Sequence, residues 1–135
     1  MKREIKFRGK RLDNGEWVYG DYFKKIISHG TISVVVHYIG WQPVSEGVIL
    51  DKYVEVDPNT VGQYTDLGYI FEDDIINVRF GSNNAPIPMQ VLFENGSWCM
   101  KEYGDDTLHD LYSYEDEIEG VLGNMYDSPE KFIME

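Results

Sequence analysis

The sequence has one cysteine, and this scarcity excludes several kinds of protein. Cys99 has no second cysteine with which to form a disulfide in the chain, and a zinc site built from several thiolates is excluded. No apolar run approaches the length of about 18–20 residues that a membrane-spanning helix needs. The basic start of the chain is not followed by the apolar segment of a secretory signal. We therefore expect a cytoplasmic protein that does not associate with a membrane.

Cations are also scarce, with 12 Lys and Arg against 24 Asp and Glu and a net charge of −12. A nucleic-acid-binding module neutralises phosphates with clustered cations, so we expect no direct binding to nucleic acid. The charge is uneven: residues 1–11 carry +5, the other 124 residues carry −17, and residues 102–119 hold eight acids and no Lys or Arg. In the simpler interpretation, the basic segment lies beside an acidic part of the same fold. In the other, it meets the acidic segment of a neighbouring copy and forms a homo-oligomer.

What the chain does have is a β pattern. Hydrophobic residues make up 42% and aromatic residues 14% of the 135 residues, enough to fold as one domain spanning residues 1–135. Ile5 and Phe7 alternate with Lys6 and Arg8, which is the period of a half-buried strand. Residues 13–15 then form a turn, and we expect further strands at 17–19, 22–27, 31–39, 48–56, 75–80 and 118–126. The turn at residues 57–60 is a candidate boundary between subdomains 1–60 and 61–135.

The strongest local signal is an Asn-Gly pair between two strand-like runs, residues 90–94 and 97–101. Such a pair is typical of a two-residue hairpin turn. This register places Phe93 opposite Trp98 and Val91 opposite Met100 on a core face, with Cys99 on the other face. Two short helices are also predicted, one within residues 105–114 and one at residues 128–131, where Ser128 is a candidate N-cap. The expected fold is therefore mainly β, with one or two short helices.

Three parts of the chain together resemble the YopX family, small proteins encoded mainly by phages and prophages of bacteria. They are residues 3–10 (REIKFRGK) with 15–21 (GEWVYGD), residues 61–67 (VGQYTDL) with 70–76 (IFEDDII), and residues 118–130 (IEGVLGNMYDSPE). The resemblance implies a mixed β architecture whose C-terminal part is similar to a small SH3-like barrel. It implies no catalytic residues. The sequence departs from the family in a short turn at residues 68–69 and in Asp73, where members usually have Gly before a strand.

Catalytic and metal-binding patterns are weak. Cys99 lies inside a predicted strand, where a lone cysteine is usually a small hydrophobic residue. The three histidines, His29, His37 and His109, lack metal-ligand spacing. Asp73 and Asp74 are adjacent, and neighbours in a strand point to opposite faces, so they are poorly placed to share an ion. We expect no catalytic residue, no metal and no cofactor.

The residues with a contact role are exposed aromatics and clustered charges. The candidate protein-contact residues are Trp41, Tyr64, Asp105, Asp106, Asp110, Lys6 and Arg8. The preferred hypothesis is a non-catalytic phage or prophage accessory protein that binds another protein, from host or phage, and self-associates. The alternative is an acidic mimic of nucleic acid that occupies the basic groove of a host DNA-binding protein. A metal-dependent hydrolase is the third hypothesis.

Overall fold

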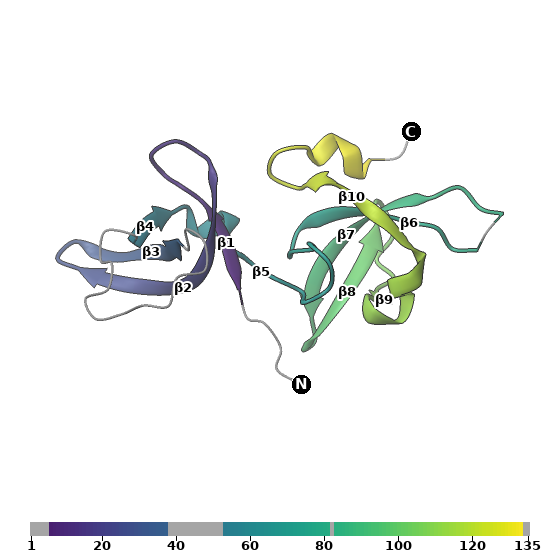
Figure 1. Ribbon diagram of the computed structural model, residues 1–135, viewed down its shortest axis with the longest axis horizontal. Coiled ribbons are helices and arrows are strands. Elements are labelled where there is room, and N and C mark those ends of the chain that lie inside the picture. Colours follow the sequence, from purple (N-terminus) through teal and green to yellow (C-terminus); the bar gives the residue numbers. More distant parts are fainter. Residues whose placement is uncertain (1–5, 38–52, 82, 134–135) are drawn as a thin grey trace. The chain divides into compact units, whose positions relative to one another are not determined.

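The computed structural model describes residues 6–37, 53–81 and 83–133, which form ten strands in two antiparallel sheets of five strands each. The prediction of a mainly β protein is confirmed (Figure 1). The chain divides into two compact units, Met1–Tyr64 and Thr65–Glu135. The sequence placed a boundary four residues earlier, between residues 60 and 61. Within the described residues, no helix is long and apolar enough to cross a membrane.

The first unit is built on a sheet of strand order β4-β3-β2-β1-β5. Its elements are β1 (Phe7–Lys10), β2 (Trp17–Ile27), β3 (Gly30–His37), β4 (Tyr53–Val56), the 3-10 helix η2 (Pro58–Thr60) and β5 (Gly62–Gln63). Both hairpins predicted in this half are present, and the return strand is longer than expected because β2 continues from one hairpin into the next. Trp41, one of the candidate protein-contact residues, falls outside the described residues.

The core of the first unit lies on one face of this sheet. Val18, Val35 and Val56 are almost fully buried there, and the ring of Tyr22 packs against them. The sheet curls, because Arg11 forms an isolated bridge with Val56 and the Leu12 amide donates to the Glu55 carbonyl at 3.2 Å. The end of β4 is thereby brought to the end of β1.

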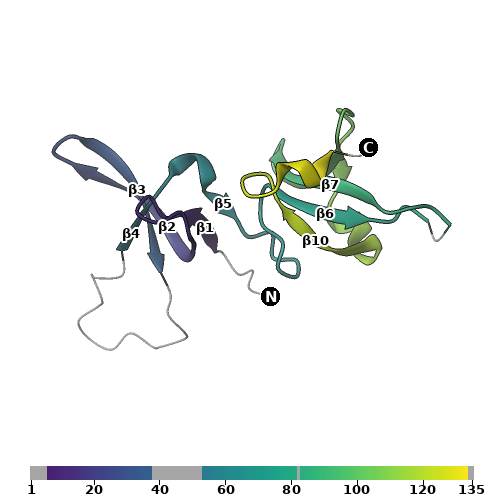
Figure 2. The same ribbon diagram turned by 90° about the horizontal axis from the view of Figure 1, so that it is seen from above.

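The second unit has the strand order β10-β6-β7-β8-β9. Its elements are β6 (Asp74–Val78), β7 (Ile87–Glu94), β8 (Ser97–Glu102), β9 (His109–Asp110), the 3-10 helix η3 (Tyr112–Glu117), β10 (Ile118–Asn124) and the 3-10 helix η4 (Pro129–Phe132). Figure 2 shows β6, β7 and β10 from a second direction, with η4 following β10.

The hairpin of β7 and β8 has the predicted register: Phe93 pairs with Trp98, Val91 with Met100, and Leu92 with Cys99. Its two-residue turn is possible because Asn95 and Gly96 adopt φ of 52° and 82°, the left-handed region that Asn and Gly tolerate best. The alternation then buries one row of side chains in the main core.

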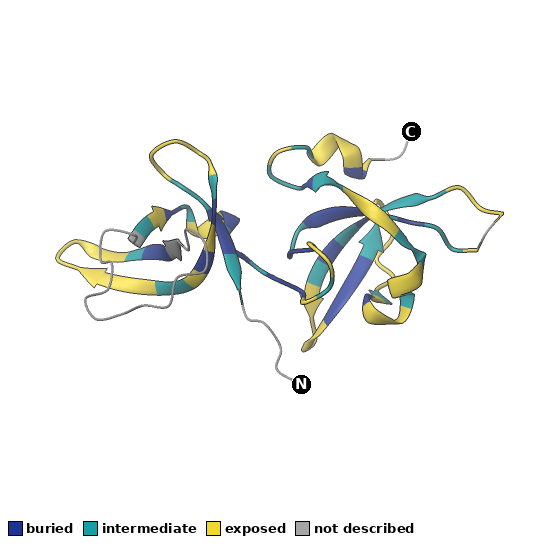
Figure 3. Ribbon diagram, viewed as in Figure 1, coloured by how far each residue is buried: buried dark blue, intermediate teal, exposed yellow. Residues whose placement is uncertain are grey.

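Both faces of the second sheet are covered. The main core contains Ile76, Val91, Trp98, Met100 and other apolar residues, and Figure 3 shows buried stretches along β7 and β8. On the other face, η4 packs against β7, and its Phe132 is buried and lies edge-on to Tyr103. Cys99 is 5% exposed.

The helix predicted within residues 105–114 is wrong. Residues His109–Asp110 form β9 instead, and the Leu111 amide donates to the Trp98 carbonyl, which carries the pairing one residue further. Leu108, Leu111 and Tyr112 have the spacing of one face of a helix. Only Leu111 is buried, however, and Leu108 and Tyr112 are exposed. The turn predicted at residues 128–131 is present as a 3-10 helix with Pro129 in its first turn, but the Ser128 side chain makes no capping hydrogen bond.

Asp73 adopts the left-handed conformation that favours Gly, with φ of 67°. Its carboxylate accepts hydrogen bonds from Gln90 Nε2 at 3.0 Å and from the Tyr126 hydroxyl at 2.7 Å. Its amide donates to the Val91 carbonyl, and its carbonyl accepts from the Met125 amide. Asp73 therefore occupies a strained position in the turn and also joins the start of β6 to β7 and to the segment after β10.

Candidate functional site

The cations predicted as contacts on the first strand lie against aromatic rings. The Arg8 guanidinium carbon is 4.5 Å from the centre of the Trp17 ring, and Arg8 is only 5% exposed. The Lys6 ammonium lies 5.0 Å from the centre of the Tyr64 ring, and Tyr64 is itself buried. Cations at such distances from rings are attracted to them. Arg8 belongs to β1, which lies between β2 and β5, and Lys6 directly precedes that strand.

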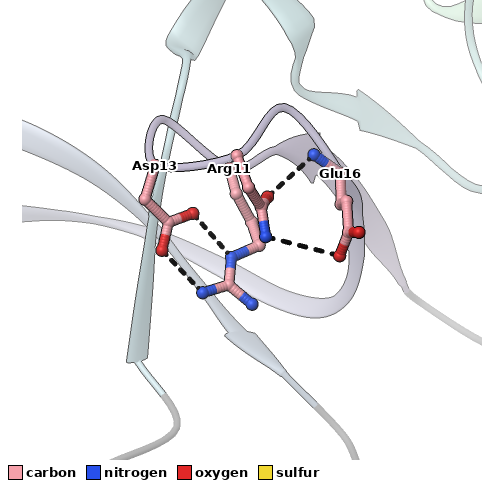
Figure 4. A network of polar contacts seen from close by, with 4 residues as sticks. Arg11, Asp13 and Glu16 are labelled. Carbon is pink, nitrogen blue, oxygen red and sulfur yellow. Dashed lines mark hydrogen bonds and ion pairs between the residues drawn. The ribbon is translucent and has the colours of Figure 1, made fainter.

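The turn after β1 holds a short polar network, drawn in Figure 4. Arg11 donates to Asp13 through Nε at 2.8 Å and through Nη2 at 2.7 Å, and the Arg11 amide donates to the Glu16 carbonyl. The hydrogen bonds from Arg11 hold the pKa of Asp13 below its ordinary value, although burial acts in the opposite direction. This pair orders the turn at the surface.

We expect the Arg11→Gln change to raise the pKa of Asp13 toward its ordinary value, because the charged donor is removed. An acid whose folded pKa is depressed contributes stability above its unfolded pKa, and that contribution is lost as the pH falls through the folded pKa. The pair is exposed, so we expect little change in the stability of the unit at neutral pH. NMR titration of the Asp13 carboxyl carbon measures the shift, and an identical titration in the variant would contradict it.

The predicted acidic contacts lie at the surface between β8 and η3. Asp105, Asp106 and Asp110 are all exposed. Asp105 accepts a hydrogen bond from the Thr107 amide, which lowers its pKa. Asp110 accepts from the Ser113 amide at 2.9 Å and from its hydroxyl at 2.6 Å, so it also holds the start of η3.

Groups that could support metal or nucleophilic chemistry are not brought together in the part of the chain that the structure describes. No cluster of three His, Cys, Asp or Glu residues is placed there to hold a metal ion. Asp73 and Asp74 turn to different partners, since Asp74 accepts from the Phe71 amide at 2.8 Å. Burial raises the pKa of the Cys99 thiol, which keeps it protonated.

A shallow cavity of about 230 Å³ lies beside β10, lined by Arg79, Gly81, Asp116, Glu117 and Glu119. Arg79 is paired with Glu119 through Nε at 2.8 Å and also donates to the Asn84 carbonyl at 2.6 Å. The pair lowers the pKa of Glu119. Ligand pockets are usually larger, about 300–1,000 Å³, and more apolar. The groups here tie the loop after β6 to β10.

A surface that the sequence did not single out lies at one end of the second sheet. Phe93 and Trp98 form a cross-strand pair whose ring centres are 5.0 Å apart, and Phe93 is 47% exposed although Trp98 is 3% exposed. Leu111, which follows β9, donates its amide to the Trp98 carbonyl. Three adjacent strands therefore present this end of the sheet together.

The same end includes the loop of residues 65–70. The Tyr112 hydroxyl donates to the Thr65 carbonyl, and Ile70 belongs to the same core as Trp98. On this loop Tyr69 is 90% exposed, and on η3 Tyr112 is 43% exposed. We call Tyr69, Phe93, Trp98 and Tyr112 the Trp98 rim.

Two further properties distinguish the Trp98 rim. The acids close to it in sequence, Asp66, Glu94, Asp110 and Glu115, are all exposed. Beneath it, the buried Nε1 of Trp98 has no acceptor among the described residues. An unsatisfied buried donor costs about 1–3 kcal/mol. The rim thus combines exposed rings with exposed acids that are close to them in sequence.

The sequence contained part of this signal. The register of the Asn-Gly hairpin already placed Phe93 and Trp98 on one face next to the turn, where the core ends. The contribution of Tyr69 and Tyr112 could not be found that way, because it depends on a hydrogen bond between residues 47 positions apart.

Comparison with known families gives one match. Residues 6–132 match the family described as YopX protein. That range includes all ten described strands. The comparison with curated proteins gives no match.

Proposed function

The chain belongs to the YopX family, and we propose that it is a non-catalytic module that binds other proteins through the Trp98 rim. The observation that carries the proposal is that Tyr69, Phe93 and Tyr112 are exposed on segments that meet at the buried Trp98. Tyr and Trp are enriched among the residues that contribute most to the free energy of binding. Their rigid side chains also lose less conformational entropy at an interface than flexible side chains do.

The chemistry of the rim favours a particular partner. Exposed acids are close in sequence to the residues of the rim, so a partner segment with an apolar side chain and neighbouring Lys or Arg would satisfy both features. An acidic partner would be repelled.

We also infer that the second unit is an open form of an SH3-like barrel. Support comes from its strand order, β10-β6-β7-β8-β9, and from the 3-10 helix η3 directly before the last strand. This architecture hosts many unrelated functions, so the fold alone does not specify a role.

The place of action is proposed to be the cytoplasm of a bacterium that carries the phage or prophage. The single cysteine is buried and unpaired with another thiol, which suits a reducing compartment. The partner belongs to the host or to the phage, and no cofactor is needed for the role.

Capture from a bacterial lysate tests the rim. The full tagged chain is compared with the Tyr69→Ser/Phe93→Ser variant, and retained proteins are quantified by mass spectrometry. We expect the variant to retain its specific partner about tenfold less, the effect of losing an interfacial aromatic anchor.

Leu12→Ser provides a matched control, because Leu12 is an exposed apolar residue, 57% exposed, in the first unit. It should retain the partner like the unmodified chain. Equal retention by the rim variant and the control would remove the rim from the proposal.

A second candidate function is mimicry of nucleic acid, and it rests on the difference in net charge between the two units. Met1–Tyr64 holds nine Lys or Arg and eight Asp or Glu, a net of +1, whereas Thr65–Glu135 holds three and sixteen, a net of −13. A basic groove would attract such a unit strongly at low salt. The Asp106→Lys variant tests the mimicry in the same capture experiment. Asp106 is chosen because it is exposed, whereas Asp110 also anchors η3.

A further inference from the structure

The β2–β3 hairpin of the first unit extends beyond its sheet. β1 pairs with β2 only over residues 17–20, and β4 pairs with β3 only over residues 33–36. Residues 25–32 therefore pair only with each other among the described strands. Figures 1 and 2 show this ribbon reaching past β1 and β4. A two-stranded ribbon without neighbours is marginally stable in water.

The tip of this ribbon is apolar and basic. Ile26 is 84% exposed and Ile27 is 38% exposed. Lys24 and Lys25 precede them and are exposed, and residues 22–37 contain no Asp or Glu. In Figure 3 the tip is exposed throughout. The tip therefore offers an exposed isoleucine next to two cations. This combination matches the partner segment proposed for the Trp98 rim.

We propose that the β2–β3 tip of one copy docks on the Trp98 rim of a second copy. This proposal rests on the binding role of the rim and names its occupant. Ile26 packs against the rings of Tyr69 and Phe93, and the two lysines face the acids around them. If each copy gives its tip and receives its partner's, the two contacts are equivalent by a two-fold axis and the assembly closes as a dimer.

Charge complementarity selects the second copy over a membrane. The tip belongs to the unit with a net charge of +1, and the rim to the unit with a net charge of −13. An exposed isoleucine with two lysines could also insert into an anionic bilayer. The second unit would then be repelled by the same surface.

Sedimentation velocity over a range of concentrations tests the proposal with the full chain. We expect the unmodified protein to dimerise, and Ile26→Asp and Phe93→Ser each to raise the dissociation constant about tenfold or more. Tyr69→Ser should also raise the dissociation constant. Because Tyr69 is more exposed than Phe93, this change should leave the fold intact. It therefore separates loss of the contact from loss of the fold. Leu12→Asp should leave dimerisation unchanged.

Mixing the two single variants gives the sharpest result. The Ile26→Asp chain retains an intact rim and the Phe93→Ser chain an intact tip, so each mixed pair keeps one complete contact. The mixture should therefore associate more strongly than either variant alone. A monomer at all concentrations, a dimer insensitive to Ile26→Asp, or no gain on mixing would overturn the proposal. So would a monomer whose binding to vesicles containing phosphatidylglycerol depends on Ile26.

The same variants separate this proposal from the binding role of the rim. If Phe93→Ser loses a captured partner while the unmodified chain stays monomeric, the rim binds another protein and the second copy is excluded. If Phe93→Ser changes neither capture nor self-association, the binding role itself fails.

Discussion

Replacing Asp73 by Ala should lower the free energy of unfolding of the second unit by about 3–4 kcal/mol. Two effects combine. The left-handed backbone, with φ of 67°, costs about 1–2 kcal/mol for a residue with a β-carbon that gains nothing in return. Loss of the carboxylate also removes the hydrogen bonds from Gln90 and Tyr126, each worth about 1 kcal/mol.

The order of three substitutions separates these effects. Asp73→Asn keeps tolerance of the left-handed region and an acceptor oxygen, so it should be mildest. Asp73→Gly relieves the backbone but loses both hydrogen bonds, so it should be intermediate, and Asp73→Ala should be worst. Urea unfolding followed by Trp98 fluorescence, with Trp17 and Trp41 changed to Phe, measures all three.

Asp66 supplies the matched control within the same unit. It has φ of 65° and is exposed. Asp66→Ala should therefore cost only the backbone contribution, about 1 kcal/mol. If Asp73→Ala cost no more than Asp66→Ala, the side-chain hydrogen bonds of Asp73 would be irrelevant to stability.

The Asn-Gly hairpin illustrates what could be predicted from the sequence. Its turn residues, its register and its buried row all follow from local rules, because residues opposite each other are only a few positions apart. The turn at Asp57 and Pro58 was predictable for the same reason, and the Asp57 side chain accepts from the Asn59 amide.

The errors arose where distant residues decide the structure. Residues 105–111 have a helical spacing of apolar side chains, yet β9 forms because Met100 and Cys99 on β8 offer an open edge. Arg8 looked like an exposed cation in a half-buried strand, but it stacks on Trp17 and is buried. The Trp98 rim was missed because the loop that carries Tyr69 is joined to Tyr112 by a hydrogen bond at Thr65, between residues far apart in the sequence.

The contact between Gly9 and Val56 is the equivalent long-range feature of the first unit. A β-carbon on Gly9 would lie 3.0 Å from Val56 Cβ and 3.0 Å from its Cγ2, closer than packed carbon atoms normally approach. Val56 is fully buried in the core of the first unit. We expect Gly9→Ala to destabilise this unit by about 1–3 kcal/mol, the usual cost of overpacking.

A double-mutant cycle tests whether the clash with Val56 is the cause. Val56→Ala alone should cost about 2 kcal/mol through the cavity it leaves. In the double variant the close contacts with the two γ-carbons of Val56 are gone and the contact with Cβ remains, so the combined cost should be smaller than the sum by about 0.5 kcal/mol or more. Urea unfolding followed by Trp17 fluorescence, with Trp41 and Trp98 changed to Phe, gives the four stabilities. Additive costs would mean that Gly9 is required for another reason, and the curl that brings β4 onto β1 would not depend on this close approach.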